Sequence, residues 1–166
     1  MRNSKLSLAL LALVAVSAGA AQAQSNNASI TATATVQTPI NVLGAQQLSF
    51  GNVFPGINKT VGPNDLTNAG RFDVIGQAGS AVTLQFTLPA TLSSAGNTMP
   101  IDTYNAIRAE DLGQTVGAVM FSPGPSNAAT LSGTGGLFVW VGARVVPATN
   151  QAAGVYTGSV TLTVVY

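Results

Sequence analysis

Apolar and polar residues alternate along much of this chain, most regularly at residues 28–36, 81–88 and 154–166. A period of two places every second side chain on the same face of an extended strand. The pattern therefore predicts three half-buried β-strands. Their apolar faces carry Ala28, Ile30, Ala32, Ala34 and Val36 in the first, Val82, Leu84, Phe86 and Leu88 in the second, and Tyr156, Val160, Leu162, Val164 and Tyr166 in the third.

Shorter strand candidates lie between these segments, and turn sequences separate them. The turns are "FPG", "GPND", "SSAGN", "SPGPSN" and "SGTGG", and the shorter candidates are residues 40–43, 47–51, 71–75, 118–121 and 137–146. Many short strands with frequent Gly and Pro turns predict an all-β sandwich or barrel. No internal boundary divides the chain after residue 23, so we expect one domain over residues 24–166.

The first 23 residues have the three parts of a secretory signal peptide. Arg2 and Lys5 form a basic start, residues 6–16 are almost wholly apolar, and a small-residue stretch ends in "AQA" at Ala23. The apolar run is shorter than the roughly 20 residues that a membrane-spanning helix needs. We therefore expect an exported protein, located in the periplasm, on the cell surface or outside the cell, with no transmembrane helix in the mature chain.

Composition narrows the function. The mature chain has a net charge of −1, so no basic surface is available for nucleic acid. It has neither His nor Cys, which removes the usual general base, thiol catalysis and thiolate metal sites. Its ionic residues are Lys59, Arg71, Arg108 and Arg144 against Asp65, Asp73, Asp102, Glu110 and Asp111.

Few residues offer chemistry. Glu110 and Asp111 are adjacent and would point to opposite faces of a strand, so they are interpreted as solvated loop acids. The turn "GPNDLTN" offers one carboxylate for a calcium ion, which makes a weak site. Trp140 is interpreted as a packing residue rather than a carbohydrate platform. We expect no enzyme activity, no catalytic residues, no metal and no cofactor.

The order of several short motifs resembles a family of small secreted bacterial proteins described as domain of unknown function 4402. The motifs are "LSFGNVFPG", "GRFDVIGQAGSAVTLQFTLP", "MPIDTY" and "VGARVVPATNQAAGVYTGSVTLTVVY". This layout is similar to fimbrial subunits assembled by a periplasmic chaperone and an usher. The resemblance implies an immunoglobulin-like antiparallel β-sandwich that lacks one strand and is completed by the N-terminal strand of another subunit.

The same resemblance implies which residues would meet. Ile30, Ala32, Ala34 and Val36 would form the donor strand, and Val160, Leu162, Val164 and Tyr166 would form the acceptor edge. The two terminal strands are uncharged and free of Pro, and exposed edges of this kind pair with other chains. The expected partners are copies of this chain or related subunits, so the expected function is that of a non-enzymatic, pilin-like structural protein.

Two alternatives remain open at the level of sequence. Residues 29–36 can be the first strand of a complete, monomeric sandwich that serves as a cell-surface binding or adhesion module. An aromatic residue after alternating apolar positions also resembles the closing strand of a small outer-membrane β-barrel. The central segments are shorter than the roughly 9–11 residues of a membrane-spanning strand, which disfavours the barrel.

Overall fold

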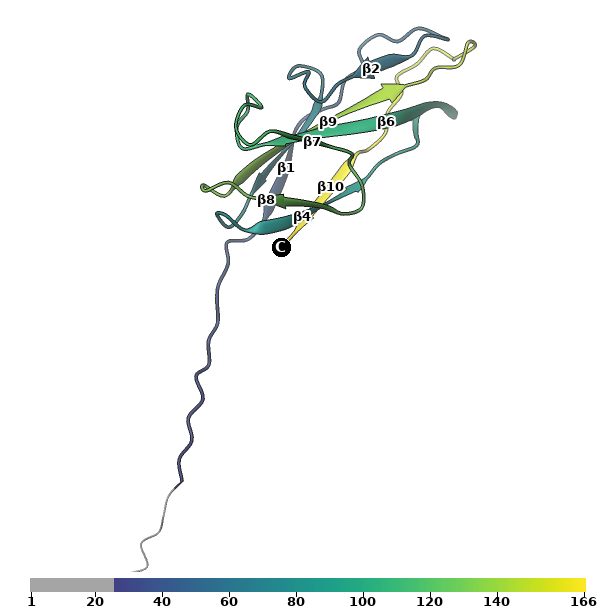
Figure 1. Cartoon of the computed structure of the whole chain (residues 1–166). Helices are drawn as coiled ribbons and strands as arrows, with labels where there is room; N and C mark the ends of the chain where they lie inside the picture. The colour runs from purple at the N-terminus through teal and green to yellow at the C-terminus, as the bar shows by residue number, and fades with distance from the viewer. Residues whose placement is uncertain (1–25) are drawn as a thin grey trace, which may run out of the picture. The chain divides into compact units, whose positions relative to one another are not determined.

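The computed structural model describes residues 26–166, and the predicted signal peptide lies outside this range. Residues 26–35 and residues 36–166 form two separate units, and the second is called the body below. The body is all-β, and its strands pair antiparallel (Figure 1). They are β1 (Asn41–Gln46), β2 (Lys59–Val61), β3 (Gly70–Ile75), β4 (Ala81–Thr87), β5 (Thr91–Ser94), β6 (Asn97–Ala109), β7 (Val119–Phe121), β8 (Asn127–Thr130), β9 (Gly136–Val145) and β10 (Thr161–Val165). Within residues 26–166, no helix is long and apolar enough to cross a membrane.

The strands form two sheets. The larger has the order β1-β3-β9-β6-β5, with β2 pairing along β9 and β7 along β6. The smaller has the order β10-β4-β8. The chain changes sheets between β4 and β5, while β5 and β6 are joined by a tight hairpin. Ala95 and Gly96 at its tip have φ angles of 44° and 86°, as a two-residue hairpin turn requires.

The main core lies between the two sheets. Val82, Leu84 and Phe86 alternate on β4 and meet the inward residues Val139 and Val141 of β9. Each such side chain contributes about 1.5–3 kcal/mol when it leaves water. The expected all-β sandwich is therefore confirmed, and the predicted apolar face of β4 is the one that is buried.

Strand β9 is buried on both faces. Its outward residues Phe138 and Trp140 lie in a second cluster with Val61 and Ala109, and their rings are 6.1 Å apart. Trp140 is only 1% exposed. The prediction that Trp140 is a packing residue is confirmed.

A third cluster occupies the part of the larger sheet nearest to β2. Met99, Ile101, Ala143 and Val145 form it together with Leu92. Figure 1 shows β6 and β9 extending beyond β4 and β8 towards β2. Here the sheet is covered by segments outside the strands, including Leu48, Phe50, Val53 and Tyr156. Every strand and all three clusters of the described residues 26–166 lie within residues 40–166, so removal of residues 24–36 deletes none of them.

Three predictions of local structure need correction, and one strand was not predicted. Residues 26–39 lie in no strand, and all are exposed, so the predicted strand at 29–36 is wrong for this chain alone. Small Ala and Thr side chains bury too little apolar area to hold a strand without a partner sheet. Residues 47–51 also form no strand. Of residues 154–166, only Thr161–Val165 is a strand. The strand β6 at Asn97–Ala109 was not among the predicted strands.

Candidate functional site

The body has a groove of about 1060 Å³. One side is formed by residues 44–55, which follow and include the end of β1, and the other by residues 151–160, which precede β10. Its floor is the inner face of the larger sheet, through Phe72, Leu92, Met99, Ile101 and Val141. Among the described residues that line the groove, none carries a charge.

Both sides of the groove are extended segments whose far edge is already hydrogen-bonded. The Ser49 N–H donates to the Asn68 carbonyl at 2.8 Å, and Thr157 exchanges two hydrogen bonds with Ser93 of β5 at 2.8 and 3.0 Å. These hydrogen bonds attach each side of the groove to a neighbouring segment of the body.

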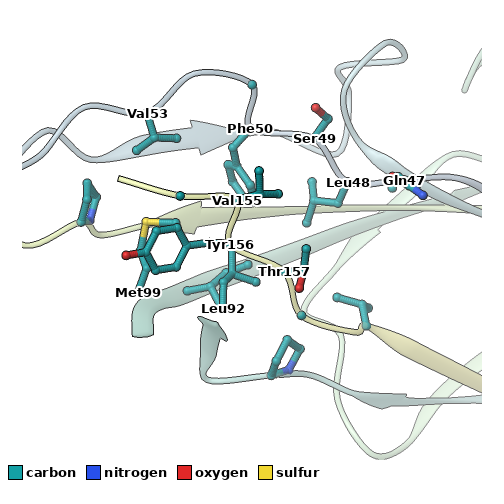
Figure 2. A pocket seen from close by; sticks show the side chains of 18 of the residues that line it. Gln47, Leu48, Ser49, Phe50, Val53, Leu92, Met99, Val155, Tyr156 and Thr157 are labelled. Carbon is teal, nitrogen blue, oxygen red and sulfur yellow. The ribbon is translucent and has the colours of Figure 1, made fainter. Parts of the chain in front are cut away.

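Figure 2 shows the side chains at this site. Leu48 and Phe50 point to the same side of their segment, towards residues 155–157, while Ser49 points to the other side. Tyr156 lies over Met99, and Leu92 lies near them. The Tyr156 hydroxyl donates to the Ala152 carbonyl at 2.8 Å and accepts from the Gln151 amide at 2.6 Å, which holds this side of the groove in place.

Strand β10 continues the groove wall with a free edge. On β4, the Phe86 N–H donates to the Gly124 carbonyl, and the Ser80 carbonyl accepts from the Leu131 N–H. The backbone N–H and C=O groups of the even-numbered residues of β4 are therefore directed away from β10. Leu162 and Val164 oppose Phe86 and Leu84 in the register. Their backbone N–H and C=O groups are therefore directed to the open edge of β10. Their side chains face the core, where Leu162 is buried and Val164 half-buried.

The predicted acceptor residues thus occupy three different positions. Val160 lines the groove, while Leu162 and Val164 form the edge beyond it. Tyr166 lies at the opposite end of β10, where its hydroxyl accepts from the Gln77 N–H at 2.7 Å and donates to the Thr38 carbonyl. A Cβ atom at Gly76 would lie 2.8 Å from the Tyr166 hydroxyl, so glycine makes this close approach feasible. We call Thr38, Gly76, Gln77 and Tyr166 the closed end.

The predicted donor residues are exposed. Ile30 is 97% exposed and Val36 is 94% exposed, and Ala32 and Ala34 between them are exposed too. Sequence reasoning missed the groove floor and the side at residues 44–55. The alternation of Leu48 and Phe50 was read as a strand, although these residues form a groove wall.

Comparison with known proteins gives one result. A family model described as "Domain of unknown function (DUF4402)" matches residues 54–166. The chain belongs to this DUF4402 family. No curated protein matches it. The matched region of the DUF4402 domain begins inside the groove wall at Phe54, includes the groove floor and β10, and leaves β1 and the donor residues outside.

Three aspartates of this DUF4402 protein hold local structure. Asp102 on β6 accepts two hydrogen bonds from Arg144 on β9, at 2.8 and 2.9 Å, and these bonds hold the pKa of Asp102 below its usual value. Asp65 accepts from the backbone of Thr67 and Asn68 within its own turn, so its carboxylate organises that turn. Within residues 26–166, no group of three or more potential ligands could hold a metal ion.

Asp111 organises a second loop. Its carboxylate accepts backbone hydrogen bonds from Gly113, Thr115 and Val116 at 2.7–3.1 Å, and these lower its pKa, with the Val116 bond the largest cause. Tyr104 donates to the Pro89 carbonyl at 2.8 Å, and burial raises the pKa of Tyr104 to about 12, with a smaller contribution from Asp102. Each of these groups has a structural partner.

Proposed function

We propose that this protein is an exported, non-enzymatic structural subunit of a fimbria-like surface assembly. In this proposal, residues 29–36 of one subunit add a β-strand to the groove of another. One observation carries the proposal: the chain contains both an exposed alternating segment without a sheet partner and a groove with an apolar floor that leads to the edge strand β10.

The donor segment suits the groove in chemistry. Its apolar face consists of Ile30, Ala32, Ala34 and Val36, and the groove has an uncharged lining with an apolar floor. Eight extended residues span about 26 Å. Full burial of Ile30 and Val36 would contribute about 1.5–3 kcal/mol each, and each backbone hydrogen bond about 0.5–1.5 kcal/mol. These contributions must exceed the entropic cost of association, which is at least about 4 kcal/mol.

A structural role also agrees with the polar chemistry of the body. Asp65, Asp102 and Asp111 are all engaged by neighbouring backbone or guanidinium groups. The groove itself has neither a charged group nor a His or Cys in its lining, so it offers no general base or thiol nucleophile. A binding role for another chain is therefore the best use of this groove.

The direct test separates the donor from the acceptor. Deleting residues 24–36 should leave a folded body, and a synthetic peptide of residues 26–37 should then stabilise it. At a peptide concentration 100 times Kd the gain is about 2.7 kcal/mol, which corresponds to a rise in Tm of several degrees. The control peptide has the same composition with each apolar residue exchanged with the following Thr, or Gln37 for Val36, which moves the apolar face to the other side.

The cellular test is negative-stain microscopy of cells with and without the gene, accompanied by mass spectrometry of the exported protein. We expect surface filaments only with the gene and a mature chain that begins at Gln24. If the exported protein is a monomer, forms no filaments and has a body that the peptide does not stabilise, these results would favour the monomeric binding module instead.

A further inference from the structure

The donor segment and the groove belong to the same chain, so the segment could in principle turn back and fill its own groove. The connection between donor and body is residues 37–39, "QTP", which lead directly into β1. To reach its own groove, the donor would have to reverse here and run antiparallel along the free edge of β1. The geometry of this connection can therefore be compared with that of a β-hairpin.

The faces of β1 decide which hairpins are useful. Ile40 and Val42 face the main core, whereas Asn41 and Leu43 are exposed. A two-residue loop at Thr38 and Pro39 would place Val36 opposite Asn41 and Thr35 opposite Val42. A strand paired in this register directs Thr35 into the core and Val36 outward, because opposing residues share a face. A four-residue loop has the same parity, so it would also direct the Thr face of the donor into the core.

A three-residue loop at residues 37–39 has the correct parity, since it places Val36 opposite Ile40 and Ala34 opposite Val42. This loop consists of a type I turn followed by a residue in the left-handed region. The left-handed position is Pro39, whose ring fixes φ near −65°. The position before it, Thr38, must be helical, and a following Pro disfavours that conformation. A five-residue loop would remove Val36 from the strand.

The closed end adds a second restraint on the same connection. The Thr38 N–H and hydroxyl donate to the Gln77 side chain at 3.3 and 3.1 Å, and the Thr38 carbonyl accepts from Tyr166. Reversal at Thr38 would have to break these hydrogen bonds. The backbone of residue 38 is thus held in place by two other parts of the body.

We infer that Pro39, together with the hydrogen bonds of Thr38, prevents the donor segment from filling its own groove, so that the occupant of each groove is the donor segment of a second copy. This inference rests on the function proposed above. It identifies Pro39 as the residue that makes strand donation intermolecular. The proposal requires no change in the groove itself.

The experiment uses two proteins, the full-length mature protein and an acceptor that consists of residues 37–166. When the two are mixed, the full-length protein should bind the acceptor through its donor segment. Pro39→Gly supplies the left-handed residue and frees Thr38, and the double variant with Tyr166→Phe also removes the hydroxyl that binds Thr38. Pro39→Ala is the matched control, because Ala remains unfavourable in the left-handed region.

We expect the natural chain and Pro39→Ala to bind the acceptor, either singly or as the last subunit of a self-assembled series, and Pro39→Gly to bind it more weakly. If the Gly variant fills its own groove in about nine of ten molecules, its apparent Kd for the acceptor rises about tenfold. The affinity of the double variant for the acceptor should be lower still. The measurements are light scattering after size exclusion and the rate at which proteinase K cleaves residues 26–36, which should fall in the Gly variants.

Three outcomes would overturn the inference, and they can be distinguished. Equal binding by the natural chain and both Gly variants would mean that Pro39 does not prevent closure. A natural chain that is monomeric by light scattering and fails to bind the acceptor, although the free peptide does bind, would mean that the donor already fills its own groove. Failure of both the peptide and the natural chain would overturn the proposed function along with the inference.

Discussion

Placing a single carboxylate on either face of the donor strand gives a sharp test of strand donation. Ala34 lies on the predicted groove face and Thr33 on the opposite face, so Ala34→Asp and Thr33→Asp introduce the same charge at adjacent positions. The described lining of the groove contains no Lys or Arg that could compensate a buried carboxylate. Ala34→Asp should therefore bind in its protonated form, while Thr33→Asp should stay ionised in water.

The magnitude follows from the cost of that proton. An Asp side chain has an ordinary pKa of about 3.9, so holding it neutral at pH 7 costs about 3 pKa units, or about 4 kcal/mol. Ala34→Asp should weaken peptide binding by about 1000-fold at pH 7. At pH 5 the same calculation gives a cost of about 1.5 kcal/mol, so the Ala34→Asp peptide should bind about tenfold more weakly than the natural peptide. Binding of the Ala34→Asp peptide should thus improve by about 100-fold between pH 7 and pH 5.

The assay is titration calorimetry of the natural peptide and both variants against the body that lacks residues 24–36. The chain has no His, the side chain whose ordinary pKa falls between pH 5 and 8, which makes this pH range suitable. The natural and Thr33→Asp peptides should show little pH dependence. Equal affinities of the two variants at pH 7, or a deficit of Ala34→Asp that is as large at pH 5 as at pH 7, would refute burial of this face.

Three further predictions concern the body. The Arg108 guanidinium donates to the Ala128 carbonyl on the outer edge of β8. In the protein of residues 37–166, Arg108→Ala should cause association that increases with concentration, because it removes the charge from this edge. Gel filtration that still gives a monomer would contradict this. Asp111→Asn should lower the urea midpoint at pH 7 but not at pH 2, because a lowered pKa gives stability that is present above pH 3.8 and lost as the pH falls through the folded value. Tyr104→Phe should reduce the free energy of unfolding by about 1 kcal/mol in urea titrations, through loss of the hydrogen bond to Pro89, and an unchanged value would mean that water replaces this bond.

The alternation of apolar and polar residues predicted those strands that pack one face against the core. β3, β4 and β9 appear within one or two residues of their predicted ranges, because their apolar residues meet a core on at least one face. β6 was missed because its pattern is interrupted: Thr103 has a φ of 51°, and the pairing with β9 shifts register between Asp102 and Asn105. A bulge of this kind breaks the period of two that sequence reasoning depends on.

The groove could not be predicted in the same way. Its two sides are about 100 residues apart in the sequence, and each reads as a strand because one of its edges is indeed paired, at Ser49 and at Thr157. Whether the other edge faces a neighbouring strand or an open groove depends on how the sheets are stacked. The donor residues were named from the resemblance to pilins, and only their exposure is visible in the structure.

The two outer edges of the smaller sheet differ in a way that favours association in one direction. The β8 edge carries the Arg108 guanidinium on its Ala128 carbonyl, and a charged side chain on an edge discourages the addition of another strand. The β10 edge directs the backbone groups of Leu162 and Val164 outward and has no charged residue of its own. A strand can therefore add beside β10 without displacing an ion, and the same addition at β8 would require desolvating Arg108. An assembly built on this subunit should grow through the β10 side alone, which gives it a defined polarity and leaves the β8 side as outer surface.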